Sequence, residues 1–362
     1  MTFNLKKFSF RAVPIWLWVI ICLLVIIRIT LPYIGLHVIN WALANKLGQY
    51  QGSIQDFDLS LYRGAYQLER LEIKKKNTNL APILSVLELD LSLAWRTLFS
   101  GKISGDVNLD RLVVRIMDSE KEEKKQNGTD EAGWQEALNY IVPISIESLK
   151  LRNSAFYFTN NDLKVPLPLQ IEGIYGHAED LQSRARKPSE SLSPFYLEGL
   201  LQGHAKLKLA GKLDALAKPP RFEGTFSLED FHPKSVNALL LSYVPLDLTS
   251  GDISVYGETA TAKGEVKGYV NLFLKDVDVI APDQKILSFK HFLVEIVSAF
   301  ANWILQTKNE KVLAAHVPFS RTNGKFDVNY GEAFSSAVKN KREPLKKGFD
   351  HSISLKNIEG NK

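Results

Sequence analysis

Ser336 and Lys339 are the residues of this 362-residue chain whose spacing best fits covalent chemistry. Ser-x-x-Lys is the nucleophile pattern of serine acyl-enzymes, where S-D-N and K-T-G elements accompany it. Neither companion element occurs in the sequence. The pair also falls in a basic segment near the end of the chain, where we expect no strand and helix framework to position it. A hydrolase or transferase is therefore retained only as an alternative.

Other motifs of catalysis or cofactor binding are missing from the sequence. Its seven histidines, at positions 37, 177, 204, 232, 291, 316 and 351, include no H-E-x-x-H pair. There is no G-x-S-x-G elbow, no Walker loop and no G-x-G-x-x-G. Glu88 and Asp90 alternate with leucines, as on the solvated face of a strand, and do not suggest an acid–base pair. We therefore expect no enzyme, no metal site and no cofactor.

The elements that dominate the sequence are strands. Residues 87–94 alternate leucine with Glu, Asp, Ser and Ala, and residues 57–62 show the same period of two. This period is typical of a strand with one apolar and one polar face. Gly and Pro residues separate further expected strands at residues 107–109, 112–116, 144–151, 155–158, 167–171, 204–209, 222–228, 253–256, 265–274, 277–280 and 326–330.

Three helices are expected between these strands, at residues 132–141, 233–243 and 293–305. The last has the clearest apolar stripe, with apolar residues at i, i+3, i+4 and i+7. Polar insertions at residues 119–131 and 182–193 indicate solvated loops.

An apolar run at residues 13–31 predicts a transmembrane helix. At about 1.5 Å per residue it spans roughly 28 Å, close to the hydrocarbon thickness of a bilayer. Basic residues precede the run, which indicates a cytoplasmic N-terminus, and Arg28 near its outer end can snorkel to the headgroups. The alternatives are a signal peptide cleaved near residues 42–44 and a buried core helix. The run is too long and too apolar for either.

Net charge limits the classes of binding partner, and cysteine content indicates the cellular compartment. The formal charge is +5, and the first 31 residues supply four positive charges and no negative ones. The remainder is nearly neutral, which argues against nucleic acid. The single cysteine, Cys22, lies in the apolar run, so the rest of the chain forms no disulfide. A disulfide-free exported domain fits a bacterial periplasm better than a eukaryotic exterior.

A sheet with one apolar face must cover that face, and two arrangements remain open. A second sheet or helices would give a closed core. A long sheet that curls along its length would instead leave an apolar groove for acyl chains, where each buried methylene contributes about 0.8 kcal/mol. The apolar stripe of residues 34–47 would lead from the membrane to the first strand.

Several segments resemble AsmA-like bacterial envelope proteins. Residues 48–54 (GQYQGSI) lead into residues 56–66 (DFDLSLYRGAY), which looks like the start of such proteins. Later blocks resemble an uncharacterised single-pass inner-membrane branch of this superfamily, at residues 201–214 (LQGHAKLKLAGKLD), 251–256 (GDISVY), 267–270 (KGYV) and 274–277 (LKDV). The resemblance covers most of residues 13–330. The motifs of the resemblance are turn glycines and alternating strands, which are structural and indicate no catalysed reaction.

The resemblance implies a Gram-negative inner-membrane protein with a periplasmic β-sheet groove. Relatives are similar to bridge-like lipid transfer proteins and are tied to phospholipid movement toward the outer membrane. This chain is shorter than the best-known members, because some 14–16 strands at about 4.8 Å spacing give a groove of roughly 70 Å. A complete bridge would therefore need outer-membrane or other envelope proteins, or self-association.

The sequence thus predicts a mostly β protein with a few helices, in which a transmembrane helix precedes an elongated, curled antiparallel sheet that forms an apolar groove. The expected function is phospholipid binding and transfer in support of the outer membrane. A non-catalytic envelope scaffold or assembly protein with a closed β domain is the alternative. The expected boundaries are 1–12 cytoplasmic tail, 13–31 transmembrane helix, 32–48 exit helix, 49–330 periplasmic AsmA-like β domain and 331–362 basic flexible tail. The candidate groove-lining residues are Leu87, Leu89, Leu91, Leu93, Ile253, Val255, Val270, Leu272 and Leu274.

Overall fold

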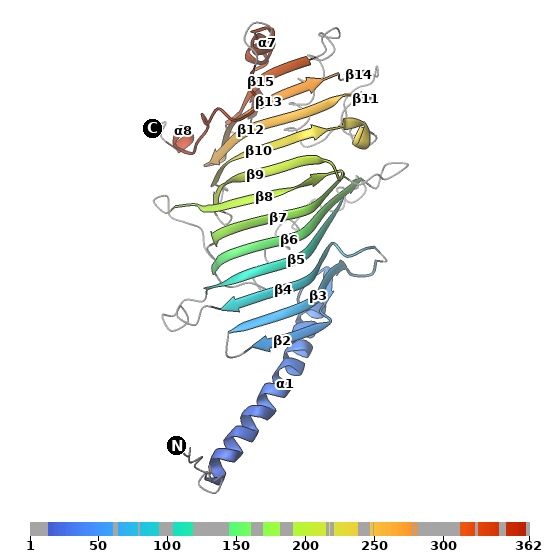
Figure 1. Ribbon diagram of the computed structural model, residues 1–362, viewed down its shortest axis with the longest axis vertical. Coiled ribbons are helices and arrows are strands. Elements are labelled where there is room, and N and C mark those ends of the chain that lie inside the picture. The colour runs from blue at the N-terminus through green and yellow to red at the C-terminus, as the bar shows by residue number, and fades with distance from the viewer. Residues whose placement is uncertain are drawn as a thin grey trace, which may run out of the picture.

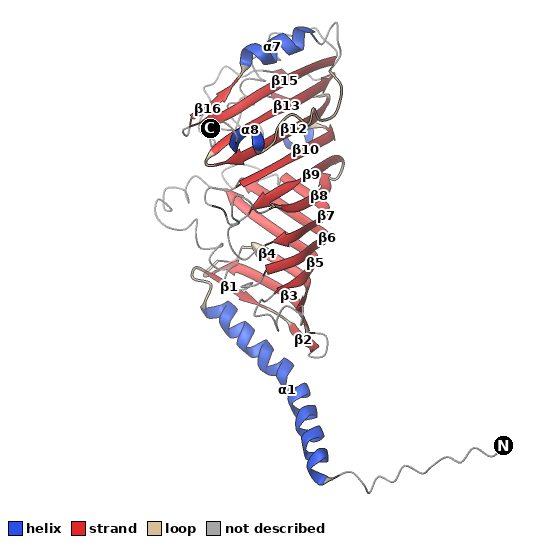
Figure 2. Cartoon of the chain, turned by 90° about the vertical axis from the view of Figure 1, so that its left-hand side faces the viewer, coloured by secondary structure: helices blue, strands red, loops and turns tan. Residues whose placement is uncertain are grey.

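The computed structural model of the chain shows one long helix followed by an open sheet (Figure 1). The strands are stacked along the long axis of the molecule, with α1 at one end and α7 at the other (Figure 2). The structure describes residues 14–60, 64–78, 80–93, 104–118, 145–160, 169–181, 191–214, 217, 221–237, 247–248, 250–276, 279–280, 312–322, 325–339 and 345–359.

Helix α1 (Ile15–Asn45) has 31 residues and is long and apolar enough to cross a membrane. The sequence predicted a transmembrane helix that continues out of the membrane as an exit helix, and the structure has one continuous helix with Pro32 inside it. Its last turns pack on the sheet through Leu36, Ile39 and Leu43. The helix ends before Gly48, which has the left-handed φ of +58° that favours glycine.

The main sheet has 14 strands, and its curled path does not close, because the end formed by β1 and β2 does not pair with the end formed by β16. This confirms the elongated, curled sheet expected from the sequence. β11 and β14 form a separate two-stranded sheet. The strands are β1 (Tyr50–Ser53), β2 (Asp56–Ser60), β3 (Ala65–Lys75), β4 (Leu84–Leu93), β5 (Ser104–Asp118), β6 (Ser145–Asn160), β7 (Leu169–Leu181), β8 (Ser193–Leu201), β9 (Ala205–Asp214), β10 (Arg221–Phe231), β11 (Asp247–Leu248), β12 (Asp252–Ala262), β13 (Glu265–Lys275), β14 (Val279–Ile280), β15 (Val312–Thr322) and β16 (Lys325–Val328).

One strand pair corrects the expectation of an antiparallel sheet. β5 and β6 are parallel, whereas the other described neighbours in the main sheet are antiparallel. A parallel pair needs a crossover of roughly a dozen or more residues, and residues 119–144 between the two strands are long enough to supply it. The sheet is therefore mixed.

A line of left-handed residues crosses several neighbouring strands. Arg70 of β3, Arg111 of β5, Asn153 of β6 and Gly173 of β7 have φ values of 51°, 51°, 49° and 59°. The pairing between strands leaves these positions out. In β3, β4 and β5 the register is the same on either side of the gap, so one residue of each strand is unpaired and the alternation of faces shifts by one, as Leu68 and Leu71 in one cluster show. Between β6 and β7 the register itself shifts, as at a β-bulge, which bends the strand. The bends contribute to the curl of the sheet across its strands.

The C-terminal part of the chain is more ordered than the sequence predicted. Residues 331–362 were expected to be a flexible tail, but helix α7 (Tyr330–Lys339) packs against β15, and helix α8 (Lys356–Glu359) contacts β12 and β13. Ser336 of α7 accepts a hydrogen bond from the backbone N–H of His316 and donates one to its carbonyl. Ser336 of α7 therefore satisfies two backbone groups of β15. An exposed edge strand would leave such groups without a protein hydrogen-bond partner.

Of the three helices expected between the strands, the structure describes only the start of one. The helix predicted at residues 233–243 begins as a single 3-10 turn, η3 (Pro233–Val236), and its later residues lie largely outside the described part of the chain. The helices predicted at residues 132–141 and 293–305 lie outside the described residues.

Candidate functional site

One face of the main sheet carries an uninterrupted row of apolar residues. Residues that pair across neighbouring strands point to the same face, so the register can be followed from strand to strand. The resulting set, called the apolar row, contains a single residue from each of twelve strands and has no polar side chain. It runs through Phe57, Leu68, Leu89, Leu109, Leu151, Gly176, Leu197, Leu209, Phe226, Gly257, Val270 and Val317.

A second row on the same face lies two residues away along each strand. Its side chains are apolar or glycine except for the hydroxyl groups of Tyr66 and Thr259. The members of this second apolar row are Leu59, Tyr66, Leu91, Val107, Leu149, Ala178, Phe195, Gly211, Gly224, Thr259, Gly268, Phe319 and Val328. The apolar face therefore follows the sheet from β2 to β16.

The opposite face is polar over most of the same strands. The row between the two apolar rows begins with charged and amide side chains and becomes more mixed after β8. Its members are Asp58, Gln67, Asp90, Asn108, Lys150, His177, Tyr196, Ala210, Thr225, Glu258, Tyr269 and Pro318. On the same side Lys208 lies across from Glu198. The contrast gives most of the sheet a water-facing side and an apolar side. At β12 and β13 the C-terminal segment covers the polar side, where Glu258 and Tyr269 are buried.

Three buried clusters cover parts of the apolar face. Beside α1, Leu43 packs with Phe57, Leu68, Leu71 and Val86 in one cluster, which we call the α1 cluster. At the other end a second cluster, the far cluster, contains Val270, Leu272, Leu274, Ala315, Val317, Phe319 and Val328. Phe195, Leu197 and Leu209 in the middle strands are half-buried. In the same strands Leu201, Ala205 and Phe231 are buried in the third cluster. The accessible apolar side chains in the middle of the face are therefore those of the two apolar rows.

Aromatic rings lie against two of the five glycines in the apolar rows. A Cβ atom at Gly257 would collide with the ring of Phe226, and one at Gly268 would collide with the ring of Phe319. Each ring therefore lies across the neighbouring glycine and keeps the apolar face continuous. Sequence reasoning missed these positions, because the alternation stops at a glycine.

The candidate residues on β4 fall in two groups. Leu89 and Leu91 are members of the apolar rows, and Leu93 packs with Leu91 and Val107. Leu87 lies opposite the left-handed Arg70 and Arg111, between Val86 and Leu89, which both pack in the α1 cluster. The strict alternation that placed Leu87 with the other three leucines is therefore interrupted at that point.

The candidates on β12 and β13 share the apolar face. Val270, Leu272 and Leu274 belong to the far cluster, and Ile253 and Val255 pack against it. Whether these side chains contact a lipid remains a prediction. The middle strands β6 to β10 were not among the candidates, although alternating apolar residues in β8 and β9, such as Leu197 and Leu209, carry the same signal.

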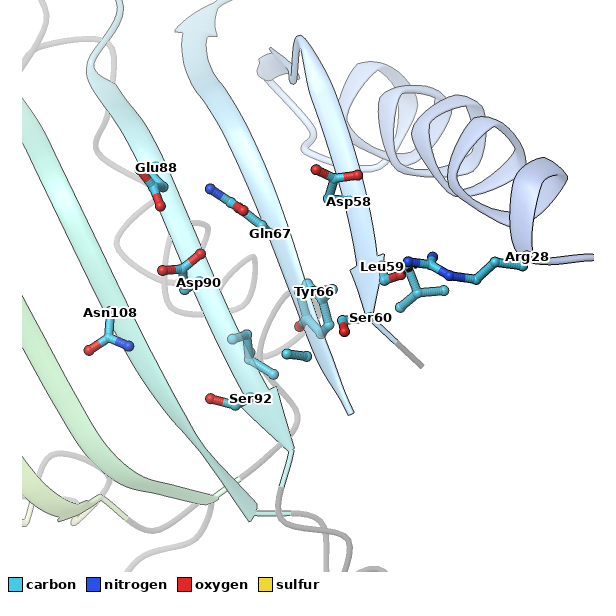
Figure 3. A pocket seen from close by; sticks show the side chains of 12 residues that line it. Arg28, Asp58, Leu59, Ser60, Tyr66, Gln67, Glu88, Asp90, Ser92 and Asn108 are labelled. Atoms are coloured by element: carbon cyan, nitrogen blue, oxygen red, sulfur yellow. Dashed lines mark hydrogen bonds between the residues drawn. The ribbon is translucent and has the colours of Figure 1, made fainter. Parts of the chain in front are cut away.

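A polar pocket of about 440 Å³ lies where α1 meets the first strands (Figure 3). Its lining combines side chains of the polar face with members of the second apolar row. Arg28 of α1 donates a hydrogen bond to the backbone carbonyl of Leu59 on β2. Burial raises the pKa of the Tyr66 phenol at the pocket wall. We call this feature the rim pocket; it is lined by Arg28, Asp58, Leu59, Ser60, Ala65, Tyr66, Gln67, Glu88, Asp90, Leu91, Ser92 and Asn108.

That the protein is not an enzyme and holds no metal stays a prediction. Within the described part of the chain, no group of three or more His, Cys, Asp and Glu side chains is arranged to hold a metal ion. The two hydrogen bonds of Ser336 to the backbone of His316 account for this serine structurally.

The sequence was compared with known proteins. No protein-family model matches it, and no match is found among the curated proteins. The AsmA-like resemblance therefore stays a prediction that rests on the segments quoted above.

Proposed function

We propose that the protein is anchored in the bacterial inner membrane by α1 and binds phospholipid acyl chains on the apolar face of its periplasmic sheet. The observation that supports this most directly is the apolar row, which crosses twelve strands without a polar side chain. Lipid transfer along such a face needs no bond to be made or broken, so the proposed protein is not an enzyme.

The size of the face fits this role. Twelve strands at about 4.8 Å spacing extend roughly 50 Å, which exceeds the length of one acyl chain. Each methylene removed from water contributes about 0.8 kcal/mol, so half-buried residues such as Leu197 and Leu209 give a lipid a favourable surface at each strand. A bridge longer than this face would need self-association or an envelope partner.

The position of α1 supports delivery of lipid from the membrane. The apolar helix continues without a break into the turns that pack on β2 and β3. A lipid leaving the outer leaflet beside α1 would therefore meet the first members of the apolar rows. We propose the cytoplasmic N-terminus and periplasmic sheet that the basic residues before the run indicate.

A non-catalytic envelope scaffold is the second candidate. The far cluster favours it, because Leu272, Leu274 and Val317 are 7%, 3% and 2% exposed and so resemble an ordinary closed core. The half-buried middle strands favour the lipid-binding protein instead.

The deciding experiment measures phospholipid bound to the full-length protein purified in mild detergent. Leu197→Glu places a charge on the apolar row, and we expect it to reduce bound phospholipid at least fivefold while the far-ultraviolet circular dichroism is unchanged. Ala210→Glu is the matched control on the opposite face of the neighbouring strand, and it should keep the lipid. Equal lipid in both variants, or a wild-type protein free of lipid, would favour the scaffold.

A further inference from the structure

The rim pocket lies at the depth where a bilayer would end. A hydrocarbon layer about 30 Å thick covers roughly 20 helical residues, so a layer that begins at Ile15 ends near Ile34. Arg28, which lines the pocket, is less than two turns before that boundary. The contact between Arg28 and Leu59 therefore brings the rim of the sheet to the outer headgroup layer.

The exposed side of α1 stays apolar past this boundary. Ile34, Val38 and Trp41 follow one another at helical spacing and are 57%, 58% and 59% exposed. They lie on the part of α1 whose other side packs on the sheet through Leu36, Ile39 and Leu43. An apolar stripe that continues a membrane-spanning helix and includes a Trp is typical of the membrane interface. Bilayer lipid is thus the occupant that best explains this stripe.

The pocket brings together charges of both signs. Asp58, Gln67, Asp90 and Asn108 come from one register row of the polar face. Figure 3 shows these side chains along β2 to β5, with Arg28 approaching from the helix at the end beside Leu59. With Glu88, the lining has three carboxylates and one guanidinium.

We propose that the rim pocket binds the headgroup of a zwitterionic phospholipid that carries a primary ammonium, with Arg28 facing the phosphodiester and Asp58 and Asp90 facing the ammonium. The assignment rests on the proposed function, since the pocket would receive lipid before its chains reach the apolar rows. An arginine is suited to phosphate, because the guanidinium presents a planar set of donors. Carboxylates accept hydrogen bonds from a primary ammonium.

The charge balance sets the expected selectivity. A purely anionic headgroup would meet three carboxylates and only one guanidinium, so repulsion disfavours it. A choline headgroup has no N–H to donate and is better recognised by aromatic cages. The pocket also includes Leu59, Tyr66 and Leu91 of the second apolar row, so acyl chains attached to a bound headgroup can pass over the rim onto the apolar face.

The experiment is competitive lipid loading of the full-length protein. The purified protein is incubated with mixed micelles containing equal amounts of phosphatidylethanolamine, phosphatidylcholine and phosphatidylglycerol, and bound lipids are counted by native mass spectrometry. We expect at least fivefold enrichment of phosphatidylethanolamine over each of the others. The double substitution Asp58→Asn with Asp90→Asn should reduce the enrichment below twofold and leave the total lipid count unchanged. Glu179→Gln, on the polar face of β7 and outside the pocket, should retain the wild-type enrichment.

The outcomes separate the pocket from the proposed function. Lipid that binds without enrichment, or enrichment unchanged by the double substitution, would overturn the pocket assignment and leave lipid binding intact. A wild-type protein that binds no lipid would contradict the proposed function and the pocket together. Soluble glycerophosphoethanolamine at millimolar concentration should not displace the bound lipid; complete displacement would show that the site takes soluble phosphodiesters rather than membrane lipid.

Discussion

A buried carboxylate binds three consecutive backbone N–H groups of the C-terminal segment. Glu258 of β12 is 2% exposed and accepts hydrogen bonds from the backbone N–H groups of His351, Ser352 and Ile353 at 2.5, 2.9 and 3.1 Å. Burial alone would raise the pKa of Glu258, but the bonds from Ile353, the Tyr269 hydroxyl, His351 and Ser352 outweigh it and hold that pKa below its ordinary value of 4.5.

The pKa of Glu258 determines how the segment responds to acid. A folded pKa below the unfolded one means that the unfolded state binds the proton more readily. The stabilisation is therefore complete above about pH 4.5 and is lost as the pH falls through the lower folded pKa. Amide exchange of residues 351–353, measured at pH 3 and at pH 6 and corrected for the intrinsic exchange rate at each pH, should show weaker protection at pH 3. Equal protection at both would contradict this role.

Substitution of the carboxylate gives the same test at neutral pH. Glu258→Gln keeps one acceptor oxygen but removes the charge, and hydrogen bonds to charged groups contribute about 1.5–3 kcal/mol. We expect amide protection of residues 351–353 to fall roughly 30-fold, which corresponds to about 2 kcal/mol. Glu265→Gln on the same face is the control and should leave the protection unchanged.

Substitution of Ser336 distinguishes a structural role of this serine from a catalytic one. Ser336→Ala removes both hydrogen bonds to His316, and a neutral bond contributes about 1 kcal/mol. The amide of His316 should exchange about fivefold faster, whereas phospholipid loading should stay at the wild-type level. Lys339→Ala should change neither quantity. Loss of loading without faster exchange would instead point to a chemical role for the Ser-x-x-Lys pair.

At the scale of the strand, the left-handed residues decide where the sheet bends. Arg70 of β3 has a φ of 51°, a conformation that β-branched residues rarely adopt. Arg70→Val should therefore destabilise the sheet by about 1–2 kcal/mol and lower the thermal midpoint by roughly 2–4 °C. Arg70→Gly should be neutral or stabilising, and Glu69→Val at the neighbouring exposed position is the control. A larger loss of stability with Gly than with Val would contradict a left-handed backbone at position 70.

The sequence predicts the strands well where the alternation is regular. Leu89, Leu91, Val270 and Leu272 were assigned to one apolar side from their period of two, and the register agrees. Leu87 was not predictable in this way, because arginine at positions 70 and 111 gives no signal of a left-handed bend. Nor does residue type show that Ser336 pairs with a strand edge.

Non-local pairing limits what the sequence can predict about the sheet as a whole. Alternation is the same in an open and in a closed sheet, so the open path from β1 to β16 follows only from the structure. The parallel pairing of β5 with β6 depends on a long connection rather than on the strands themselves. The rim pocket was not predictable either, since Arg28 and Asp90 are far apart in the chain.

At the scale of the molecule, we expect acyl chains to contact one face along the whole sheet. The most direct measurement places a photo-crosslinking amino acid at Leu89, Leu149, Leu197 or Phe226 of the apolar rows, and at Lys150, Tyr196 or Thr225 of the opposite face, outside the rim pocket. After irradiation in bacterial cells, phospholipid should be attached at all four apolar positions and at none of the three polar ones. Attachment only beside α1, or equally on both faces, would contradict a lipid path along the sheet.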